Sequence, residues 1–218
     1  MMYLDRYKKY LGLIVFALAL TGCAAPKKVD YTAFHESKPT SIVILPPLNS
    51  SLEVEAANGV LAQATLPLAE SGYYVLPVAV VEETFRQNGL ANAGDVHALP
   101  PTKLHEIFGA DAALYLDVKK YGSSYAVVSS SAIVEVEAKL LDLRTDALLW
   151  EGKQTAVQTS GSGGGLIGML VAAVIDQIVN TVTDRSYSLA AIANQRLLWA
   201  GYPGGVLYGP RSPQYAVQ

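Results

Sequence analysis

The sequence predicts a fold of the α+β class, a mixed α/β arrangement in which two β-α units precede an antiparallel meander. Three patterns predict it: a continuous apolar run at residues 41–46, apolar residues at helical spacing from 54 to 68, and alternating apolar and charged residues from 133 to 143. A fully buried strand has a continuous apolar run, whereas a strand with one solvated face alternates. The chain is therefore expected to contain both kinds of strand in one domain.

The first helix is expected directly after the strand at residues 41–46. Ser50 and Glu53 fit a capping box, in which two side chains satisfy backbone N–H groups at a helix start. Gly72 ends the helix. Its apolar face is formed by residues three or four positions apart: Val54, Ala57, Leu61, Ala64 and Leu68.

The second β-α unit follows at once. Residues 73–76 form its strand, and Pro77 suits the first turn of the next helix because proline lacks the N–H group that this turn leaves unused. A polar loop then leads to a short helix over residues 101–108. Residues 112–120 are apolar enough for another strand.

The meander begins with the alternating stretch at residues 133–143. Residues 144–146 form a polar turn, and residues 148–157, including Trp150, return as the hairpin partner. The alternation separates an apolar face (Val134, Val136, Ala138 and Leu140) from a polar one (Glu135, Glu137 and Lys139). This pattern indicates a sheet with one solvated side.

A glycine-rich joint at residues 161–165 precedes a segment that is apolar on every side. A helix of this kind must be covered all round, so it is either a buried core helix, an assembly surface or a membrane contact. Ten residues span only half a bilayer, which disfavours the last reading. We take the segment as the candidate interaction helix, with the residues Leu166, Ile167, Met169, Leu170, Val171, Val174 and Ile175. A further helix is expected over residues 186–199, and an extended tail over 201–218.

The amino terminus has the three parts of an export signal. Basic residues precede an apolar stretch at residues 11–20, which is too short to span a bilayer. Leu20, Thr21 and Gly22 then lead into Cys23 and resemble the lipobox of bacterial lipoproteins. The resemblance implies cleavage before Cys23, which would carry a diacylglycerol and an N-acyl chain.

These assignments divide the chain into a signal peptide (1–22), a lipidated anchor and tether (23–40), one domain (41–200) and the tail (201–218). Two or more acyl chains give stable membrane anchoring. Ala24 stands where an aspartate would resemble an inner-membrane retention signal. The resemblance therefore implies the outer membrane, and we expect the periplasmic face rather than the cell surface.

Composition and motifs give no sign of an active site. Acidic residues outnumber basic ones by three, which disfavours a nucleic-acid partner. His35, His97 and His105 lack metal-ligand spacing and read as surface histidines. The glycines at 161–165 are not followed by the lysine of a phosphate loop. We expect no enzyme activity, no metal and no cofactor besides the lipid.

The lipobox and residues 41–46, 72–77 and 148–152 together resemble a family of outer-membrane lipoproteins of unknown function, typified by a meningococcal vaccine-candidate antigen. Members are similar to the amino-terminal domain of TolB. The resemblance extends to domains of curli-secretion channels and to lipoproteins that activate cell-wall synthases. It implies a mixed sheet with helices packed on one face and a carboxy-terminal helical segment.

The implied role is that of an accessory subunit of an envelope export or assembly system. Such a subunit would act by binding envelope proteins or by self-association as a homo-oligomer. The alternative is a peptidoglycan-associated enzyme or an activator of a cell-wall synthase.

Overall fold

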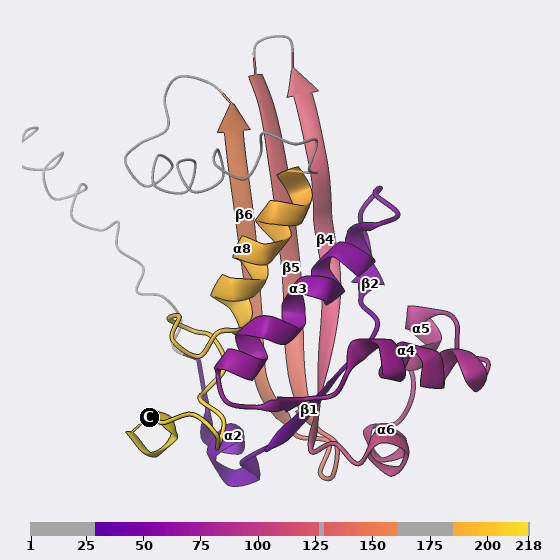
Figure 1. The fold of residues 1–218 in the computed structure, drawn as a ribbon, viewed down its shortest axis with the longest axis vertical. Helices are drawn as coiled ribbons and strands as arrows, with labels where there is room; N and C mark the ends of the chain where they lie inside the picture. Colours follow the sequence, from indigo (N-terminus) through magenta and orange to yellow (C-terminus); the bar gives the residue numbers. More distant parts are fainter. Residues whose placement is uncertain (1–28, 127–128, 161–184, 218) are drawn as a thin grey trace, which may run out of the picture.

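The structure, a computed structural model, describes residues 29–126, 129–160 and 185–217. A six-stranded mixed sheet forms its centre, with strand order β3-β1-β4-β5-β6 and β2 paired to β4 (Figure 1). Strands β1, β2, β3 and β4 are parallel where they pair, and β4, β5 and β6 are antiparallel. The strand bounds are β1 Ser41–Ile44, β2 Leu48–Asn49, β3 Tyr74–Val75, β4 Ala112–Ala126, β5 Ser129–Asp142 and β6 Leu148–Ser160.

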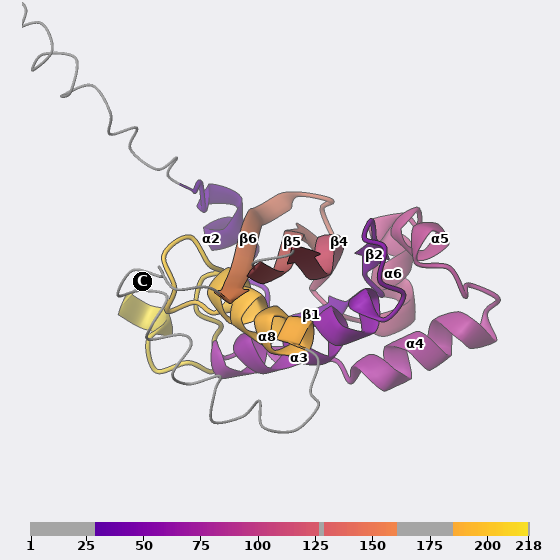
Figure 2. The same cartoon turned by 90° about the horizontal axis from the view of Figure 1, so that it is seen from above.

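Helices cover one face of the antiparallel strands. The described helices are α2 Thr32–Ser37, α3 Ala56–Glu70, α4 Val78–Gln87, α5 Ala93–His97, α6 Pro101–Phe108 and α8 Arg185–Leu198, with a 3-10 turn η1 at Tyr215–Val217. Helices α3 and α8 lie side by side on this face (Figures 1 and 2). Asn194 of α8 is buried and donates to the carbonyl oxygen of Val60 in α3 (2.7 Å). The predicted mixed sheet with packed helices and a carboxy-terminal helix is therefore confirmed.

The parallel strand β1 is covered on both faces. Ile42 and Ile44 belong to the core cluster under α3 and α8, whereas Val43 belongs to a second cluster with α4 and α6. The continuous apolar run at this strand has its explanation here, since successive side chains enter opposite layers. Helices thus also pack on the other face, but only at the β1 end of the sheet.

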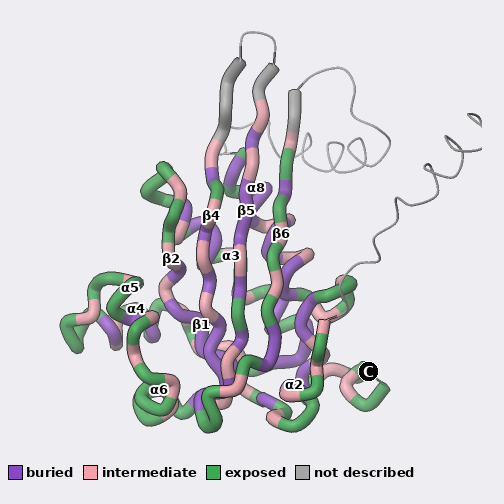
Figure 3. Tube along the Cα trace, turned by 180° about the vertical axis from the view of Figure 1, so that it is seen from behind, coloured by how far each residue is buried: buried purple, intermediate pink, exposed green. Residues whose placement is uncertain are grey.

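The antiparallel strands carry the predicted two faces. The four apolar residues of the alternating stretch in β5 are all buried. On the opposite face Lys139 is exposed and Glu137 is half-buried, whereas Glu135 is only 8% exposed. Figure 3 shows the opposite face of β4, β5 and β6, in front of which no described helix lies. The upper parts of these strands also extend beyond α3 and α8 (Figure 1).

The folded domain begins before residue 41, which corrects the predicted tether. Helix α2 lies within it, and its Phe34 is only 4% exposed and belongs to the main core. Residues 24–40 contain few large apolar side chains, which is why the sequence predicts a boundary at residue 41. Phe34, together with Tyr31 and Ala33 packed against the same cluster, fixes this short helix to the core.

The predicted capping box at Ser50 and Glu53 is also wrong. Ser50 instead donates to β4, through its N–H to the carbonyl oxygen of Val118 (2.9 Å) and through its hydroxyl to Asp117 (3.0 Å). Helix α3 starts only at Ala56, and Val54 is exposed rather than part of the apolar face.

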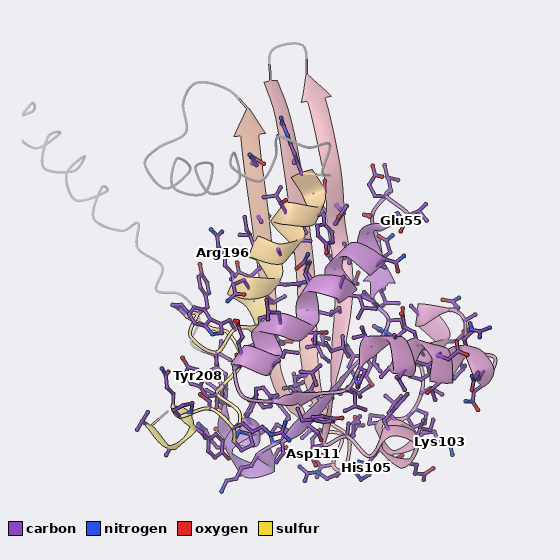
Figure 4. The ribbon with its side chains drawn as sticks, in the orientation of Figure 1. Glu55, Lys103, His105, Asp111, Arg196 and Tyr208 are labelled. Atoms are coloured by element: carbon purple, nitrogen blue, oxygen red, sulfur yellow. The ribbon has the colours of Figure 1, made fainter. Side chains whose placement is uncertain are left out.

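The tail from residue 201 to 217 lies along the domain surface and is held by backbone contacts. The indole Nε1 of Trp150 donates to Gly204 (2.9 Å), and the hydroxyl of Tyr31 donates to Gly205 (2.6 Å). Val206 is buried in the main core. Figure 4 shows Asp111, His105 and Lys103 near the lower end of the fold and Glu55 higher up, beside the start of α3.

Candidate binding groove

A groove of about 710 Å³ lies on the open face of the sheet. Its floor is formed by β4, β5 and β6, and one wall is formed by the segment that links α5 to α6. The wall exists because α4, α5 and α6 cover β1 and the beginning of β4 on this face but leave the rest of the antiparallel strands open. Four apolar residues line the groove: Leu48, Leu99, Pro101 and Leu141.

The floor toward the upper end of the strands is covered by an ion-paired network. Lys119 contacts Asp117 (2.5 Å) and Glu137 (3.6 Å). Lys153 joins Glu137 (3.1 Å) to Glu135 (2.7 Å). Lys120 adds a second contact to Glu135 (2.9 Å) from the neighbouring strand.

These pairs fix the charges of the groove. Hydrogen bonds from Lys153 and Lys120 hold the pKa of Glu135 below its ordinary value. The hydrogen bond to Asp117 raises the pKa of Lys119, and the one to Glu135 raises the pKa of Lys153. All three groups stay ionised around neutral pH, so they present fixed charges rather than protons to transfer.

The lower part of the floor is different. Lys139 of β5 stands between Tyr115 of β4 and Glu151 of β6 in the strand register. Within the described part of the chain, neither Lys139 nor Glu151 forms an ion pair, and both are exposed in the groove. Burial raises the pKa of Tyr115, with a further contribution from Asp146, so its hydroxyl remains a neutral donor. This part offers one cation, one anion and one hydroxyl beside apolar walls.

His97, at the end of α5, holds the wall against the floor. Its ring meets the Tyr115 ring edge-on, with centroids 5.1 Å apart, and its Nε2 lies 2.9 Å from the carbonyl oxygen of Pro46. A carbonyl only accepts, so Nε2 carries the proton. Burial lowers the pKa of His97, although the Pro46 contact and the charge of Asp117 act in the opposite direction.

His97 makes the stability of the fold pH-dependent. Its folded pKa lies below the unfolded value of about 6.5, so the unfolded chain takes up a proton first as the pH falls. We expect the free energy of unfolding to decrease between about pH 7 and pH 5.5, and His97→Gln to remove this part of the decrease. Urea unfolding across this range measures it, with His35→Gln at an exposed position as control. Equal slopes for wild type and His97→Gln would contradict the assignment.

The structure describes only some of the site residues that the sequence predicts. The lipobox residues Leu20, Thr21 and Gly22, Cys23, and the candidate interaction helix at 166–175 lie outside the described residues. His35 is exposed as expected. His97 and His105 are half-buried rather than superficial, and Nδ1 of His105 lies 2.7 Å from the carbonyl oxygen of Ala110.

Sequence reasoning identified the polar face of β5 but missed the groove. The signal was partly present, because the alternation in β5 puts Lys139 on the polar face. The pairing with Glu151 had no such signal, since it depends on a β-bulge between Leu140 and Leu141 that shifts the hairpin register by one residue. No local sequence pattern indicated that Leu99 and Pro101 form part of the groove wall, because they are brought near β4 only by the packing of α4 and α6.

Among residues 29–126, 129–160 and 185–217, no three histidine, cysteine, aspartate or glutamate side chains come together as metal ligands. None of the helices described in those ranges has both the length and the apolarity needed to cross a membrane.

The fold and its anchor motif define a class, that of lipid-anchored α+β domains. Residues 29–211 match the family described as GNA1162-like lipoproteins. The chain therefore belongs to the GNA1162-like lipoprotein family. It is 50% identical over 204 residues to lipoprotein NMB1124/NMB1162 of Neisseria meningitidis serogroup B, covering 92% of this chain and 94% of that protein.

One solved structure agrees with this membership. The crystal structure of lipoprotein GNA1162 from Neisseria meningitidis is 51% identical, covers 66% of this chain and 100% of that one, and has a TM-score of 0.55. A weaker likeness, with a TM-score of 0.42 and 14% identity, is to the PelC dodecamer from Paraburkholderia phytofirmans, over 78% of this chain and 91% of that one.

Proposed function

We propose that the protein is a non-enzymatic, lipid-anchored module of the cell envelope that binds an extended segment of another envelope protein in the groove. We place it on the periplasmic face of the outer membrane. The lipobox and the family membership support the anchor. The observation that carries the binding role is the lower floor of the groove, where Lys139 and Glu151 stand without ion-pair partners among the described residues beside apolar walls.

The chemistry of this floor suits a polypeptide. Apolar walls with a few polar groups are typical of the centre of a protein interface. Directly opposed side chains on neighbouring strands lie about 5 Å apart, so Lys139 and Glu151 can meet a carboxylate and an ammonium close together on one segment. A ligand with many charges of one sign fits less well, because lysines and carboxylates are equally represented in the groove.

The ion-paired upper floor supports the same role in another way. Lys119 and Lys153 are already engaged with carboxylates, so a partner that lies over them need not leave an isolated charge buried. The lysines and carboxylates there keep the sheet face solvated when no partner is bound. The upper floor is therefore a rim, and the contacts that discriminate between partners come from the lower floor.

The experiment places a benzophenone side chain at Leu99 of the full chain in cells and identifies the crosslinked protein by mass spectrometry. We expect one envelope protein to be captured, and Lys139→Glu to reduce its capture roughly tenfold, equivalent to about 1.4 kcal/mol. The double swap Lys139→Glu/Glu151→Lys keeps one positive and one negative charge on the neighbouring strands, but it exchanges the positions of these charges relative to the bound partner. It should therefore also lose capture.

Controls separate the groove from the general surface. Lys103→Glu changes an exposed lysine of α6 outside the groove and should leave capture unchanged. A benzophenone at Glu82 on the exposed side of α4 should capture a different set of proteins or none. If the swap variant captures the partner as well as wild type does, the groove is not the binding site. Turnover of purified cell wall by the protein alone would favour the enzymatic alternative.

A further inference from the structure

We infer that the domain rests against the headgroup layer of the membrane through one surface, formed by Val29, Leu148, Trp199 and Tyr202, which we call the anchor-side surface. The layer it contacts is made of zwitterionic lipids, and the contact fixes which side of the domain faces the membrane. This contact rests on the lipid anchor of the proposed function. It does not depend on the groove, because none of the four residues lines it.

The chain that leads from the lipid to the domain has few residues. The lipobox predicts the lipid on Cys23, and the described fold starts at Val29, which packs against the main core. Five residues, 24–28, stand between them, so Val29 can be at most about 20 Å from the lipidated residue even if the chain is fully extended. A domain of this size is about 40 Å across. The surface around Val29 is therefore kept close to the membrane.

The turn that follows α8 lies directly against the first residues of the domain. The hydroxyl of Tyr31 donates to the carbonyl oxygen of Gly205 (2.6 Å). A Cβ on Gly204 would stand 3.9 Å from Val29, and Gly205 lies against the backbone carbonyl of Trp199. Figures 1 and 2 show α2 and the segment after α8 together on the β6 side of the domain, with α4 on the opposite side. The anchor and the aromatic residues of this turn therefore share one side.

The anchor-side surface is apolar and aromatic. A hollow of about 320 Å³ lies between the first turn of the domain and the start of β6, and Leu148, which is 46% exposed, lines it. Trp199 is 36% exposed and Tyr202 is half-buried. Tryptophan and tyrosine are enriched where lipid meets water, because the ring is apolar and the N–H or O–H group stays hydrated. This composition suits the boundary layer of a bilayer.

The charges around the surface indicate the kind of lipid. Asp30 and Glu151 line the hollow and are exposed. Arg196 lies in the last turn of α8 (Figure 4), three residues before Trp199 and thus on the same side of the helix. A zwitterionic headgroup carries a phosphate for the guanidinium and an ammonium for the two carboxylates. A uniformly anionic layer would instead repel Asp30 and Glu151.

The test measures the fluorescence of the full, lipidated chain in vesicles of phosphatidylethanolamine and phosphatidylcholine, with and without bromine near the top of the acyl chains. The chain has two tryptophans, of which Trp150 is 1% exposed. Bromine quenches an indole only at close contact. We expect brominated vesicles to remove roughly half of the total emission, because Trp199 alone reaches the headgroup layer. Trp199→Phe should lose this response.

Two variants with an unchanged number of tryptophans test which side faces the lipid. Trp199→Phe/Leu148→Trp returns an indole to the anchor-side surface and should restore the quenching. Trp199→Phe/Val80→Trp is the matched control, since Val80 is 61% exposed on α4, on the opposite side of the domain. Its emission should be the same in brominated and ordinary vesicles.

Two results would overturn the inference and leave the proposed function intact. One is a protein that floats with the vesicles while its Trp199 emission is insensitive to bromine, because the domain then stands clear of the lipid. The other is equal quenching of the indoles at positions 80 and 199. A protein that does not float with the vesicles would overturn the anchor and this contact together. Capture from Leu99 reports on the groove separately.

Discussion

Asp142→Asn is expected to reduce the free energy of unfolding by about 3 kcal/mol, because it removes the charge of a buried carboxylate that accepts several hydrogen bonds, one of them from a half-exposed Arg144. The Asp142 side chain is only 1% exposed and lies 2.8 Å from the Arg144 guanidinium. It also accepts hydrogen bonds from the Ser37 hydroxyl and from the N–H groups of Arg144 (2.7 Å) and Thr145 (3.0 Å). For a domain of this size the loss corresponds to a melting temperature lower by about 6–12 °C.

The same carboxylate joins distant parts of the chain. Ser37 ends α2, Asp142 ends β5, and Arg144 reaches Asp111 at the start of β4 (3.6 Å). The Asp111 carboxylate in turn accepts from the N–H and hydroxyl of Thr40 (2.8 and 2.6 Å). Removing the Asp142 charge therefore loosens α2 and the β5–β6 turn together.

The effect should depend on pH in a defined direction. Burial alone would raise the pKa of Asp142, but the hydrogen bonds from Arg144, Ser37 and the two N–H groups outweigh it and hold the pKa well below its ordinary range. A lowered folded pKa contributes stability above the unfolded value of about 3.9, and this contribution is lost as the pH falls toward the folded value. The difference between wild type and Asp142→Asn should therefore shrink below about pH 4.

Thermal and urea unfolding of the solubilised full chain at pH 7 and near pH 3 measure both effects. Glu83→Gln is the matched control, since it removes one carboxylate from an exposed ion pair with Arg86 and should leave the melting temperature unchanged. A constant difference between wild type and Asp142→Asn at both pH values would show that the lost interaction is not the ionised one.

The parts of the fold that sequence predicts well are those with a local cause. The continuous apolar run in β1 and the alternation of apolar and polar residues in β5 indicate which faces of these strands are buried. The environment of each strand can therefore be predicted from the sequence alone. The same holds for the helix that begins after Pro77 and for the helix at residues 101–108. Each of these signals depends only on residues within about one element.

The parts that sequence predicts poorly depend on distant partners. Ser50 lies in a good local context for a helix cap, but its N–H and hydroxyl are used by β4, which is 67 residues away at Asp117. Phe34 lies in a short stretch whose other large apolar residue is Tyr31, and its burial depends on the core formed by distant strands and helices. The groove has the same origin, because its wall at Leu99 meets the floor at Tyr115 through tertiary packing alone.

Gly72→Ala is the second change with a large expected effect, a loss of about 3 kcal/mol that combines backbone strain with overpacking. Gly72 has φ +98°, and a Cβ at this position would stand 2.4 Å from the backbone nitrogen of Ser212. The Gly72 carbonyl also accepts from Arg211 (3.1 Å), and the Ser71 carbonyl accepts from Gly209 (2.8 Å). The tail can pass here only because two glycines, Gly72 and Gly209, let the two backbones touch.

The variant should therefore release the tail as well as destabilise the domain. Limited proteolysis followed by intact-mass measurement is expected to remove residues after about 206 from Gly72→Ala under conditions that leave wild type whole. Gly89→Ala is the control that measures backbone strain without a steric clash. Gly89 has a similar φ of +78°, but no atom lies within 4 Å of the added Cβ. That control should lose only about 1 kcal/mol from strain and keep its tail. Equal losses for the two variants would mean that the crossing of the two backbones contributes nothing to the stability of the domain.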